Sequence, residues 1–215
     1  PQAALEKILG LPTDLARRQY GLDRRDITIV YGGLMPVPLT FLTGVLVDDE
    51  QRIHVFDWDR HAERWRALDA PDDGKRFAAT GIGDLPSNAT EVVVVVSVSY
   101  RVDLDGARRF LPGLPIVHLE LVDGNPDYHW SIDKQCALAK QFLETAIALG
   151  NCGVKRIHLF LAAQNSMVFR FGRLYDKRNL PDVIVYQYER GQEPPYTWGI
   201  LMPVGKIEHA SVFRL

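Results

Sequence analysis

Side chains with amide, hydroxyl, aromatic and basic groups follow several strands that the sequence predicts, and these types suit a nucleotide ligand. The amides of Gln164 and Asn165 can donate hydrogen bonds to a base edge and accept them from it. Arg101 or Arg190 can neutralise a phosphate. Aromatic residues that can stack on bases lie near the same strand ends, namely Tyr31, Tyr100, Tyr188, Tyr196 and Trp198.

Backbone groups offer a second way to bind phosphate. The Gly32-Gly33 pair and the start of a helix over residues 166–175 both present N–H groups that can hold an anion. The alternative is purely structural, because turns are rich in Gly, Ser and Asn for backbone reasons and Tyr is common in strands. The residues themselves leave both interpretations open.

Motifs of common enzymes are missing from the sequence. The chain has no GxxxxGK[ST] phosphate-binding loop and no GxSxG nucleophile motif. Asp57, Asp59 and His61 have a spacing that resembles a metal site, but we prefer a strand that ends at Asp57 and a helix capped by Asp59. Cys136 falls on the apolar side of a predicted helix, so we expect it in the core. We therefore predict no catalytic residue, metal or cofactor.

The composition is that of a folded chain. It has 215 residues, of which 47% are hydrophobic, which excludes a disordered chain. The net charge of −2 argues against DNA binding through the whole surface. The longest apolar run, residues 92–96, is too short to span a membrane. Cys136 and Cys152 form no disulfide framework, which favours a reducing compartment. Because the chain begins at Pro1, we expect it to be a piece of a longer protein.

Hydrophobic periodicity predicts strands that alternate with helices. The expected strands are residues 27–31, 41–47, 52–56, 92–98, 115–121, 156–161, 183–188, 198–202 and 210–213, with a turn at 48–50. The expected helices are residues 3–20 with a break at Pro12, then 59–68, 103–111, 131–149 and 166–175, and residues 70–90 are expected to be a loop. The run 92–98 is apolar on both faces, as in a central parallel strand. This order indicates an α/β fold with at least partly parallel sheets.

A weak internal repeat indicates two halves. A shift of 66 residues places residues 114–117 (Leu-Pro-Ile-Val) on residues 180–183 (Leu-Pro-Asp-Val), and the strand 92–98 on residues 158–164. A true duplication and the ordinary repetition of βαβ units in this fold class both explain the match.

Several short motifs in their order and spacing resemble the SAVED domain family. The motifs are the strand 157–160 (Ile-His-Leu-Phe), the turn 162–166 (Ala-Ala-Gln-Asn-Ser), the helix segment Phe171-Gly172-Arg173, the strand 183–189 with a Tyr near its end, and, more loosely, residues 38–44 and Trp65. The resemblance covers residues 27–213, nearly the whole chain.

The resemblance implies a fold of two fused CARF-like, Rossmann-related halves with largely parallel central sheets. The chain would then divide into a helical lead-in from a missing effector (1–26), a first half (27–125) and a second half (126–215). It also implies a cytoplasmic bacterial sensor that binds a cyclic oligonucleotide and self-associates to switch on a fused effector in anti-phage defence. We expect an HNH-type DNA endonuclease as effector and a cyclic dinucleotide as ligand, with no membrane contact and no direct nucleic-acid binding by this domain.

A cyclic dinucleotide has two phosphates and two bases, and each half can supply one phosphate-binding turn and one surface for a base. The residues that we expect at this ligand are Gly33, Met35, Ser99, Tyr100, Arg101, Gln164, Asn165, Ser166, Tyr188 and Trp198. Residues 162–166 contain no Lys or Arg, so phosphate contact there would rest on backbone N–H groups and Ser166.

Two alternatives compete with a pure sensor. Some CARF-type domains cleave the ring that they bind, and Arg101, Arg170 or His118 are the residues that such a ring nuclease could use here. The other alternative is a nucleotide-binding or interaction domain outside immunity. Hydrolysis of the bound ligand separates the first two functions, and a lack of binding to every cyclic nucleotide favours the third.

Overall fold

The structure, a computed structural model, describes residues 1–23, 27–47, 52–122, 127, 129–175 and 180–214. The helices are α1 (Gln2–Leu9), α2 (Leu11–Gln19), α3 (Val37–Val47), α4 (Leu104–Phe110), α5 (Ile132–Asn151) and α6 (Asn165–Leu174). The strands are β1 (Ile29–Tyr31), β2 (Ile53–Asp59), β3 (Arg64–Ala67), β4 (Phe77–Thr80), β5 (Glu91–Ser97), β6 (Ile116–Leu121), β7 (Arg156–Ala162), β8 (Asp182–Tyr188), β9 (Tyr196–Leu201) and β10 (Ser211–Phe213). The predicted turn 48–50 and the domain boundaries at 26 and 125 lie outside the described residues.

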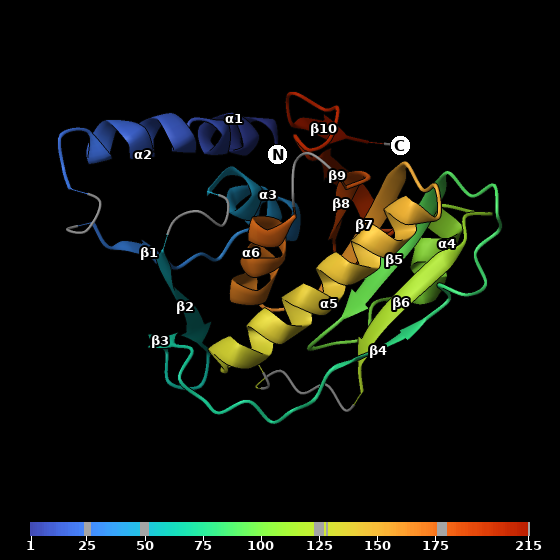
Figure 1. Cartoon of the computed structure of the whole chain (residues 1–215), viewed down its shortest axis with the longest axis horizontal. Coiled ribbons are helices and arrows are strands. Elements are labelled where there is room, and N and C mark those ends of the chain that lie inside the picture. The colour runs from blue at the N-terminus through green and yellow to red at the C-terminus, as the bar shows by residue number, and fades with distance from the viewer. Residues whose placement is uncertain (24–26, 48–51, 123–126, 128, 176–179, 215) are drawn as a thin grey trace.

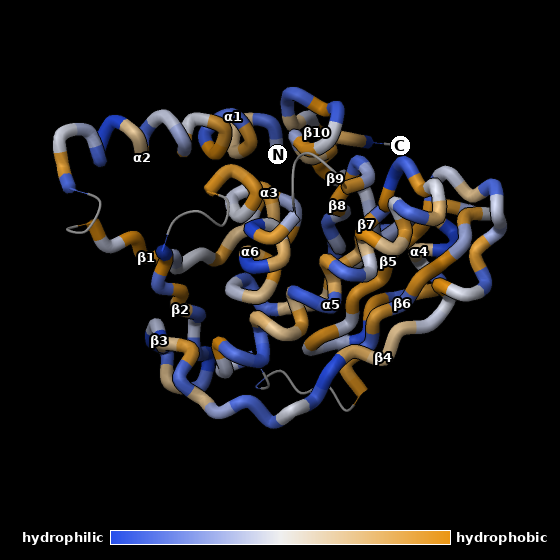
Figure 2. The backbone as a smooth tube through the Cα atoms, viewed as in Figure 1, coloured by the Kyte–Doolittle hydropathy of each residue, from blue (hydrophilic) through white to orange (hydrophobic). Residues whose placement is uncertain are grey.

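A seven-stranded mixed sheet forms the centre of the molecule (Figure 1). Its order is β10-β9-β8-β7-β5-β6-β4, in which β6, β5, β7 and β8 run parallel and the outer strands pair antiparallel. The α/β prediction with partly parallel strands is confirmed, and strands of both expected halves lie in this one sheet. Figure 2 shows apolar residues along the central strands, in contrast to the largely hydrophilic loop between β3 and β4.

Helices cover both faces of this sheet because its central strands are apolar on both sides. Val92, Val94 and Val96 point to the face covered by α3, α5 and α6, and Val93 and Val95 point to the face covered by α4. The chain winds from β5 through α4 to β6 on one side, and from β7 through α6 to β8 on the other. The strand order therefore reverses between β5 and β7, where an open α/β sheet forms a crevice at the carboxyl ends of its strands.

Helix α3 crosses α6 at very close range, and two glycines permit it. A Cβ atom on Gly44 of α3 would collide with the backbone carbonyl oxygen of Phe169, and one on Gly172 of α6 would collide with that of Phe41. Small residues at a crossing let two helix backbones approach each other. The contact fixes the position of α3 relative to the start of α6.

A second, three-stranded sheet packs against the other side of α6. Its order is β1-β2-β3, with β1 and β2 parallel and β2 and β3 antiparallel. The ring of Tyr31 stacks on Phe169 of α6 at 3.7 Å between centroids, and Val55, Leu68 and Trp130 complete this apolar cluster. The small sheet lies beyond the N-terminal end of α5 in Figure 1.

Two predicted elements are wrong. Residues 41–47 are part of helix α3 and not a strand. Residues 38–45 are all buried, and a continuous apolar run of this kind shows neither the period of a helix nor that of a strand, so the sequence could not distinguish the two. Residues 59–68 are not a helix. Asp59 does accept backbone hydrogen bonds, from His61 and Ala62 at 3.0 and 2.9 Å, but they close the turn between β2 and β3.

Two further predictions need correction. The expected loop at 70–90 contains strand β4, which pairs with β6 at the edge of the sheet. On α5, the buried side runs through Leu138, Phe142 and Leu149, whereas Cys136 and Ile132 are exposed, so Cys136 is not a core residue. A predicted cap is confirmed, since the Ser131 hydroxyl accepts the N–H of Lys134 at 3.2 Å at the start of α5.

Candidate ligand-binding site

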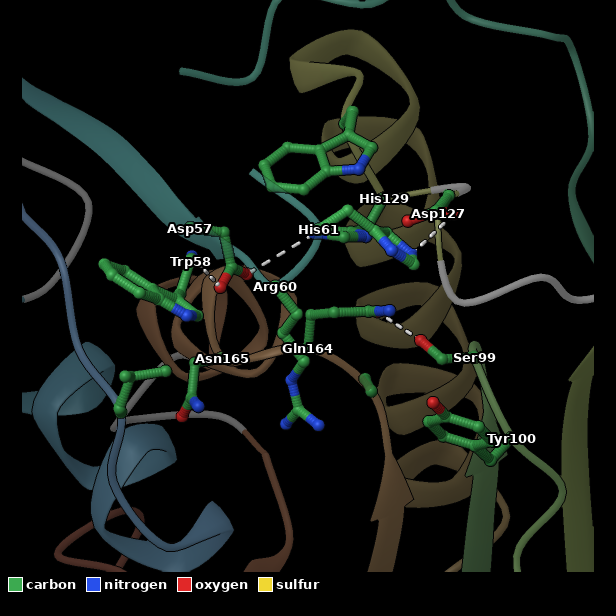
Figure 3. A pocket seen from close by; sticks show the side chains of 13 residues that line it. Asp57, Trp58, Arg60, His61, Ser99, Tyr100, Asp127, His129, Gln164 and Asn165 are labelled. Carbon is green, nitrogen blue, oxygen red and sulfur yellow. Dashed lines mark hydrogen bonds and ion pairs between the residues drawn. The ribbon is translucent and has the colours of Figure 1, made fainter. Parts of the chain in front are cut away.

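A hollow of about 460 Å³ opens at the carboxyl ends of β5 and β7, where the strand order reverses. This volume lies in the range of roughly 300–1,000 Å³ that is typical of ligand pockets. Figure 3 shows side chains around it from the ends of β5 and β7, the β2–β3 hairpin and the segment before α5, and Leu34 joins them from the segment between β1 and α3. The lining residues are Leu34, Asp57, Trp58, Arg60, His61, Ser99, Tyr100, Asp127, His129, Trp130, Ala163, Gln164 and Asn165.

Two neighbouring amide side chains at the end of β7 are held by hydroxyl groups. The Ser99 hydroxyl, after β5, donates to Oε1 of Gln164. The Thr40 hydroxyl, on α3, donates to Oδ1 of Asn165 at 2.6 Å. Both amides are therefore held in place before a ligand arrives, which reduces the entropy that binding must overcome.

A buried carboxylate closes the N-terminal end of α6. Asp57 of β2 is 4% exposed, and its Oδ2 accepts the backbone N–H of Ser166 at 3.0 Å while Oδ1 accepts that of Trp58 at 2.8 Å. Nε2 of His129 lies 3.8 Å from the same Oδ2 (Figure 3). The sequence predicts a ligand phosphate at this helix start, but in the structure the Ser166 N–H already binds the Asp57 carboxylate.

Two basic side chains of the pocket come from the hairpin between β2 and β3. Arg60 and His61 lie in its turn, and Nε2 of His61 is 3.9 Å from a carboxylate oxygen of the exposed Asp127. The backbone N–H of Ala62, and with it that of His61, holds the pKa of Asp59 below its ordinary value, so an ionised carboxylate secures this turn. The Arg60 guanidinium is therefore presented to the pocket from a defined turn.

Aromatic rings line the pocket on both sides. Trp58 is braced by Trp65 across the hairpin at 5.5 Å between centroids, and Trp130 by the guanidinium of Arg66, 4.7 Å from its ring centre. Tyr100 is 65% exposed and lines both this pocket and an adjoining hollow of about 170 Å³. The exposed ring of Tyr100 and the half-buried ring of Trp58 are suited to stack on bases, whereas Trp130 is 6% exposed and belongs to the apolar cluster.

Four of the ten predicted ligand residues line the main pocket, namely Ser99, Tyr100, Gln164 and Asn165. Arg101 lines the adjoining hollow, where its Nε pairs with Glu120 at 2.8 Å. Ser166 is fully buried, and its hydroxyl binds the side-chain amide of Gln135 at 2.8 Å.

The four other predicted residues are absent from the pocket lining. A Cβ at Gly33 would approach the hydroxyl of Tyr31, and Met35 packs against the main core. Trp198 is 8% exposed in the core and donates its indole N–H to Glu189 at 3.0 Å, and Tyr188 is an exposed residue beside Tyr196. The structure therefore does not gather these four with the pair of amides.

Sequence reasoning missed the contribution of the small sheet and of the segment before α5. The missed residues are Leu34, Asp57, Trp58, Arg60, His61, Asp127, His129, Trp130 and Ala163. The one signal for them in the sequence is the spacing of Asp57, Asp59 and His61, which resembles a metal site. Across the described residues no cluster of three or more potential metal ligands occurs.

The residues considered for ring cleavage do not meet in the pocket. His118 of β6 bonds to the Ser97 hydroxyl through Nε2 at 3.0 Å, and Arg170 of α6 bonds to Cys136 and Gln135. Neither of the two lines the main pocket.

None of the helices in the described part of the chain is long and apolar enough to cross a membrane.

Comparison with known families and structures identifies the domain type. Residues 11–202 match the SAVED family model, described as the SMODS-associated and fused to various effectors sensor domain. No curated protein sequence matches the chain.

Solved structures agree with this match. The Cap4 SAVED/CARF-domain containing receptor of Acinetobacter baumannii with the cyclic trinucleotide 2'3'3'-cAAA has a TM-score of 0.64 and 13% identity, over 89% of this chain and 41% of that chain. The same receptor with 3'3'3'-cAAA gives 0.62 and 14%, over 87% and 40%. The Cap4 receptor of Moraxella osloensis gives 0.50 and 17%, over 77% and 35%. The chain thus spans about two fifths of the length of the Acinetobacter receptors.

Proposed function

Because the chain belongs to the SAVED family of sensor domains, we propose that it binds a cyclic oligonucleotide second messenger in the pocket between β5, β7 and the β2–β3 hairpin. The observation that carries the proposal is the position of this pocket at the reversal of strand order, together with its pair of held amides. Ligands of open α/β sheets bind at this place.

The lining of the pocket supports a ligand with both bases and phosphates. Tyr100 and Trp58 offer ring faces, Gln164 and Asn165 offer amide groups, and the Arg60 turn offers positive charge. A ligand that had only phosphates would make no stacking contact with the aromatic rings. A purely apolar ligand would form no hydrogen bond with the amides and no ion pair with Arg60.

We further propose that the units β5–α4–β6 and β7–α6–β8 are the cores of two CARF-like halves. The 66-residue shift superimposes β6 on β8, and β5 and β7 pair side by side from Glu91↔Arg156 to Ser97↔Ala162. The division into a lead-in (1–26) and halves (27–125 and 126–215) remains our prediction. The proposed halves are in direct contact outside the central sheet, because α3 and β2 from the first bond to the first two residues of α6 from the second.

The output of the sensor belongs to the same proposal. Ligand binding would favour self-association of this domain and switch on a fused effector in anti-phage defence, for which an HNH-type endonuclease is our first candidate. A ligand can shift such an equilibrium only by its higher affinity for the associated form. We keep the cyclic dinucleotide as the expected ring. The Acinetobacter receptors were solved with cyclic trinucleotides, so both ring sizes belong in the test.

A thermal-shift screen against cyclic di- and trinucleotides tests the binding function. A ligand at 100 times its dissociation constant adds about 2.7 kcal/mol to the free energy of unfolding, which a melting curve detects. The ligand is recovered after each hit and analysed by chromatography. Intact ligand supports the sensor, a linear product supports the ring nuclease, and no shift with any ring contradicts the proposal.

The pocket is tested with a double variant. Gln164→Ala combined with Asn165→Ala should abolish the thermal shift, because both amides line the hollow. The matched control is Asn88→Ala, which removes an exposed amide from the loop before β5, at the opposite end of that strand. An unaltered affinity in the double variant would contradict the proposed pocket.

A further inference from the structure

The amide of Asn165 has a fixed orientation at the edge of the pocket. Its Oδ1 accepts the Thr40 hydroxyl at 2.6 Å, and its side chain lies at the mouth of the hollow in Figure 3. In an amide, the nitrogen carries both donors and the oxygen only accepts. With the oxygen turned toward Thr40, the Nδ2–H groups are the ones that face a ligand.

The Thr40 hydroxyl is committed to this contact by distance. A hydroxyl has one proton, and Oγ1 of Thr40 also lies 3.3 Å from the carbonyl oxygen of Met35. The contact with Asn165 is shorter by several tenths of an ångström. If the Asn165 amide turned over, its NH₂ group would donate to Oγ1 of Thr40 and the hydroxyl proton would turn to Met35. The separation of 2.6 Å is typical of an O–H···O bond and shorter than the roughly 2.7–3.2 Å of an N–H···O bond, which favours the oxygen on the side of Thr40.

Thr40 itself cannot easily move away from Asn165. It is completely buried in α3, and its backbone N–H donates to the carbonyl oxygen of Pro36 at 3.0 Å. The close crossing at Gly44 and Gly172 fixes α3 on α6, so the short side chain of Thr40 reaches the first residue of α6. Thr40 does not line the pocket and acts on it only through Asn165.

We propose that Thr40 and Asn165 together determine base specificity, with Asn165 donating to an acceptor atom of a purine and Thr40 acting as its positioning residue. Purine edges present unprotonated ring nitrogens, which a fixed N–H donor can recognise. A base that presents an N–H or C–H at that point leaves the donor without a partner and binds more weakly. This inference rests on the proposed function, because it assumes a nucleotide in this pocket.

The experiment compares rings that differ by one atom. The probes are the purine-containing ring that binds the wild-type domain best and the same ring with one purine nitrogen (N1, N3 or N7) replaced by C–H. The wild-type domain should bind one of these analogues roughly three- to tenfold more weakly, as expected for the loss of one hydrogen bond. Asn165→Ala should bind the natural ring and that analogue equally.

Thr40→Val separates orientation from structure, because it removes the hydroxyl and retains nearly the same shape. It should lose the discrimination between the two rings, and Thr40→Ser, which restores a hydroxyl, should recover it. A change in melting temperature alone would not produce this pattern. The inference is overturned if Thr40→Val discriminates as the wild type does, if no analogue is discriminated, or if only pyrimidine rings bind. The proposed function itself fails only if the wild-type domain binds no cyclic oligonucleotide.

Discussion

The two crossover helices of the central sheet begin in different ways. At the start of α4, the carboxylate of Asp103 accepts the N–H of Gly106 at 2.8 Å, within the same turn. At the start of α6, the N–H of Ser166 binds Asp57, which is 109 residues away in the sequence and belongs to the small sheet. A local cap serves its own helix only, whereas the remote cap also joins the small sheet to the ligand pocket.

The two helices also differ in the number of elements that pack against them. Helix α4 packs through Ala107 and Phe110 on one face of the central sheet. Helix α6 is held by α3 on one side and by the small sheet on the other, and its first residue lines the pocket. The first residue of α6 thus lines the candidate pocket, whereas no residue of α4 does.

The largest difference should appear when a methyl group is added to each helix. Gly172→Ala on α6 places a Cβ against the backbone carbonyl oxygen of Phe41, which can move only with α3. We expect a loss of about 3 kcal/mol or more of unfolding free energy, and a melting temperature lower by roughly 6–12 °C. Gly106→Ala on α4 meets mainly the Asp103 carboxylate, a side-chain group that can rotate, and should cost about 1 kcal/mol or less.

Thermal or urea unfolding of the two variants measures this difference. Gly83→Ala is the control, because its Cβ would meet no atom within 4 Å and its backbone is not in the left-handed region. Equal stability of the α4 and α6 variants would show that α3 can shift on α6, and the comparison would lose its basis.

The second largest difference concerns the caps. Asp57→Ala leaves a buried N–H of α6 without its charged acceptor and should cost about 2 kcal/mol. Asp103→Ala on α4 should cost about 1 kcal/mol, which is typical of an exchanged N-cap. Only the Asp57 change should also weaken ligand binding, because Asp57 lines the pocket and holds the hairpin that carries Arg60.

Asp57→Asn provides the matched control, since its amide oxygen can still accept the Ser166 N–H. It should recover most of the stability in the same unfolding experiment. If Asp57→Ala and Asp103→Ala lower the free energy of unfolding equally and neither changes the dissociation constant of the ligand, the cap that Asp57 provides has no role beyond that of an ordinary N-cap.

A smaller effect distinguishes the two arginines of the pocket region. Arg60 lines the main pocket and has no carboxylate partner among the described residues, whereas Arg101 is paired with Glu120. Arg60→Gln should weaken ligand binding roughly two- to fivefold at low salt and less at high salt, as expected for an exposed charge. Arg101→Gln should change the dissociation constant less. Titration calorimetry at two salt concentrations measures both, and a stronger effect at Arg101 would reverse the assignment.

The sequence predicted the elements whose signals are local. The strand at 92–98 has apolar residues on both faces, and the Ser131 cap lies within one turn of the helix that it starts. The predictions for residues 41–47 and 59–68 were wrong for different reasons. Burial on every side removes the hydrophobic period from residues 41–47, and the tight turn after Asp59 resembles the start of a helix. Neither distinction is visible without the tertiary structure.

The same limit applies to the pocket. Residues at the ends of β5 and β7, such as Ser99 and Asn165, were predicted because parallel strands end at one edge of a sheet. Asp57, Arg60 and His129 were not, because a separate sheet and the segment before α5 bring them there, and no sequence pattern encodes that packing. Trp198 was misplaced because a strand residue faces the core or the solvent according to register, which the sequence alone did not fix.

The weakest expected difference is a pH dependence that involves one histidine in each unit. Burial lowers the pKa of His158 on β7 below its ordinary 6.5, although the Glu91 carboxylate, 2.9 Å from Nε2, opposes this and Arg156 adds to it. Burial also lowers the pKa of His118 on β6, with Glu120 opposing and Arg101 adding. Both histidines therefore take up protons more readily in the unfolded chain.

The sign of the effect follows from this difference in proton binding. As the pH falls below about 6.5, the unfolded chain gains protons that the folded chain does not, so the folded state loses stability. The melting temperature should fall between about pH 7 and pH 5.5, a window above the range in which carboxylates titrate. His158→Gln should reduce this fall more than His118→Gln, because His158 is 4% exposed and His118 only partly buried. A fall of the same size in wild type and both variants would mean that other groups cause it.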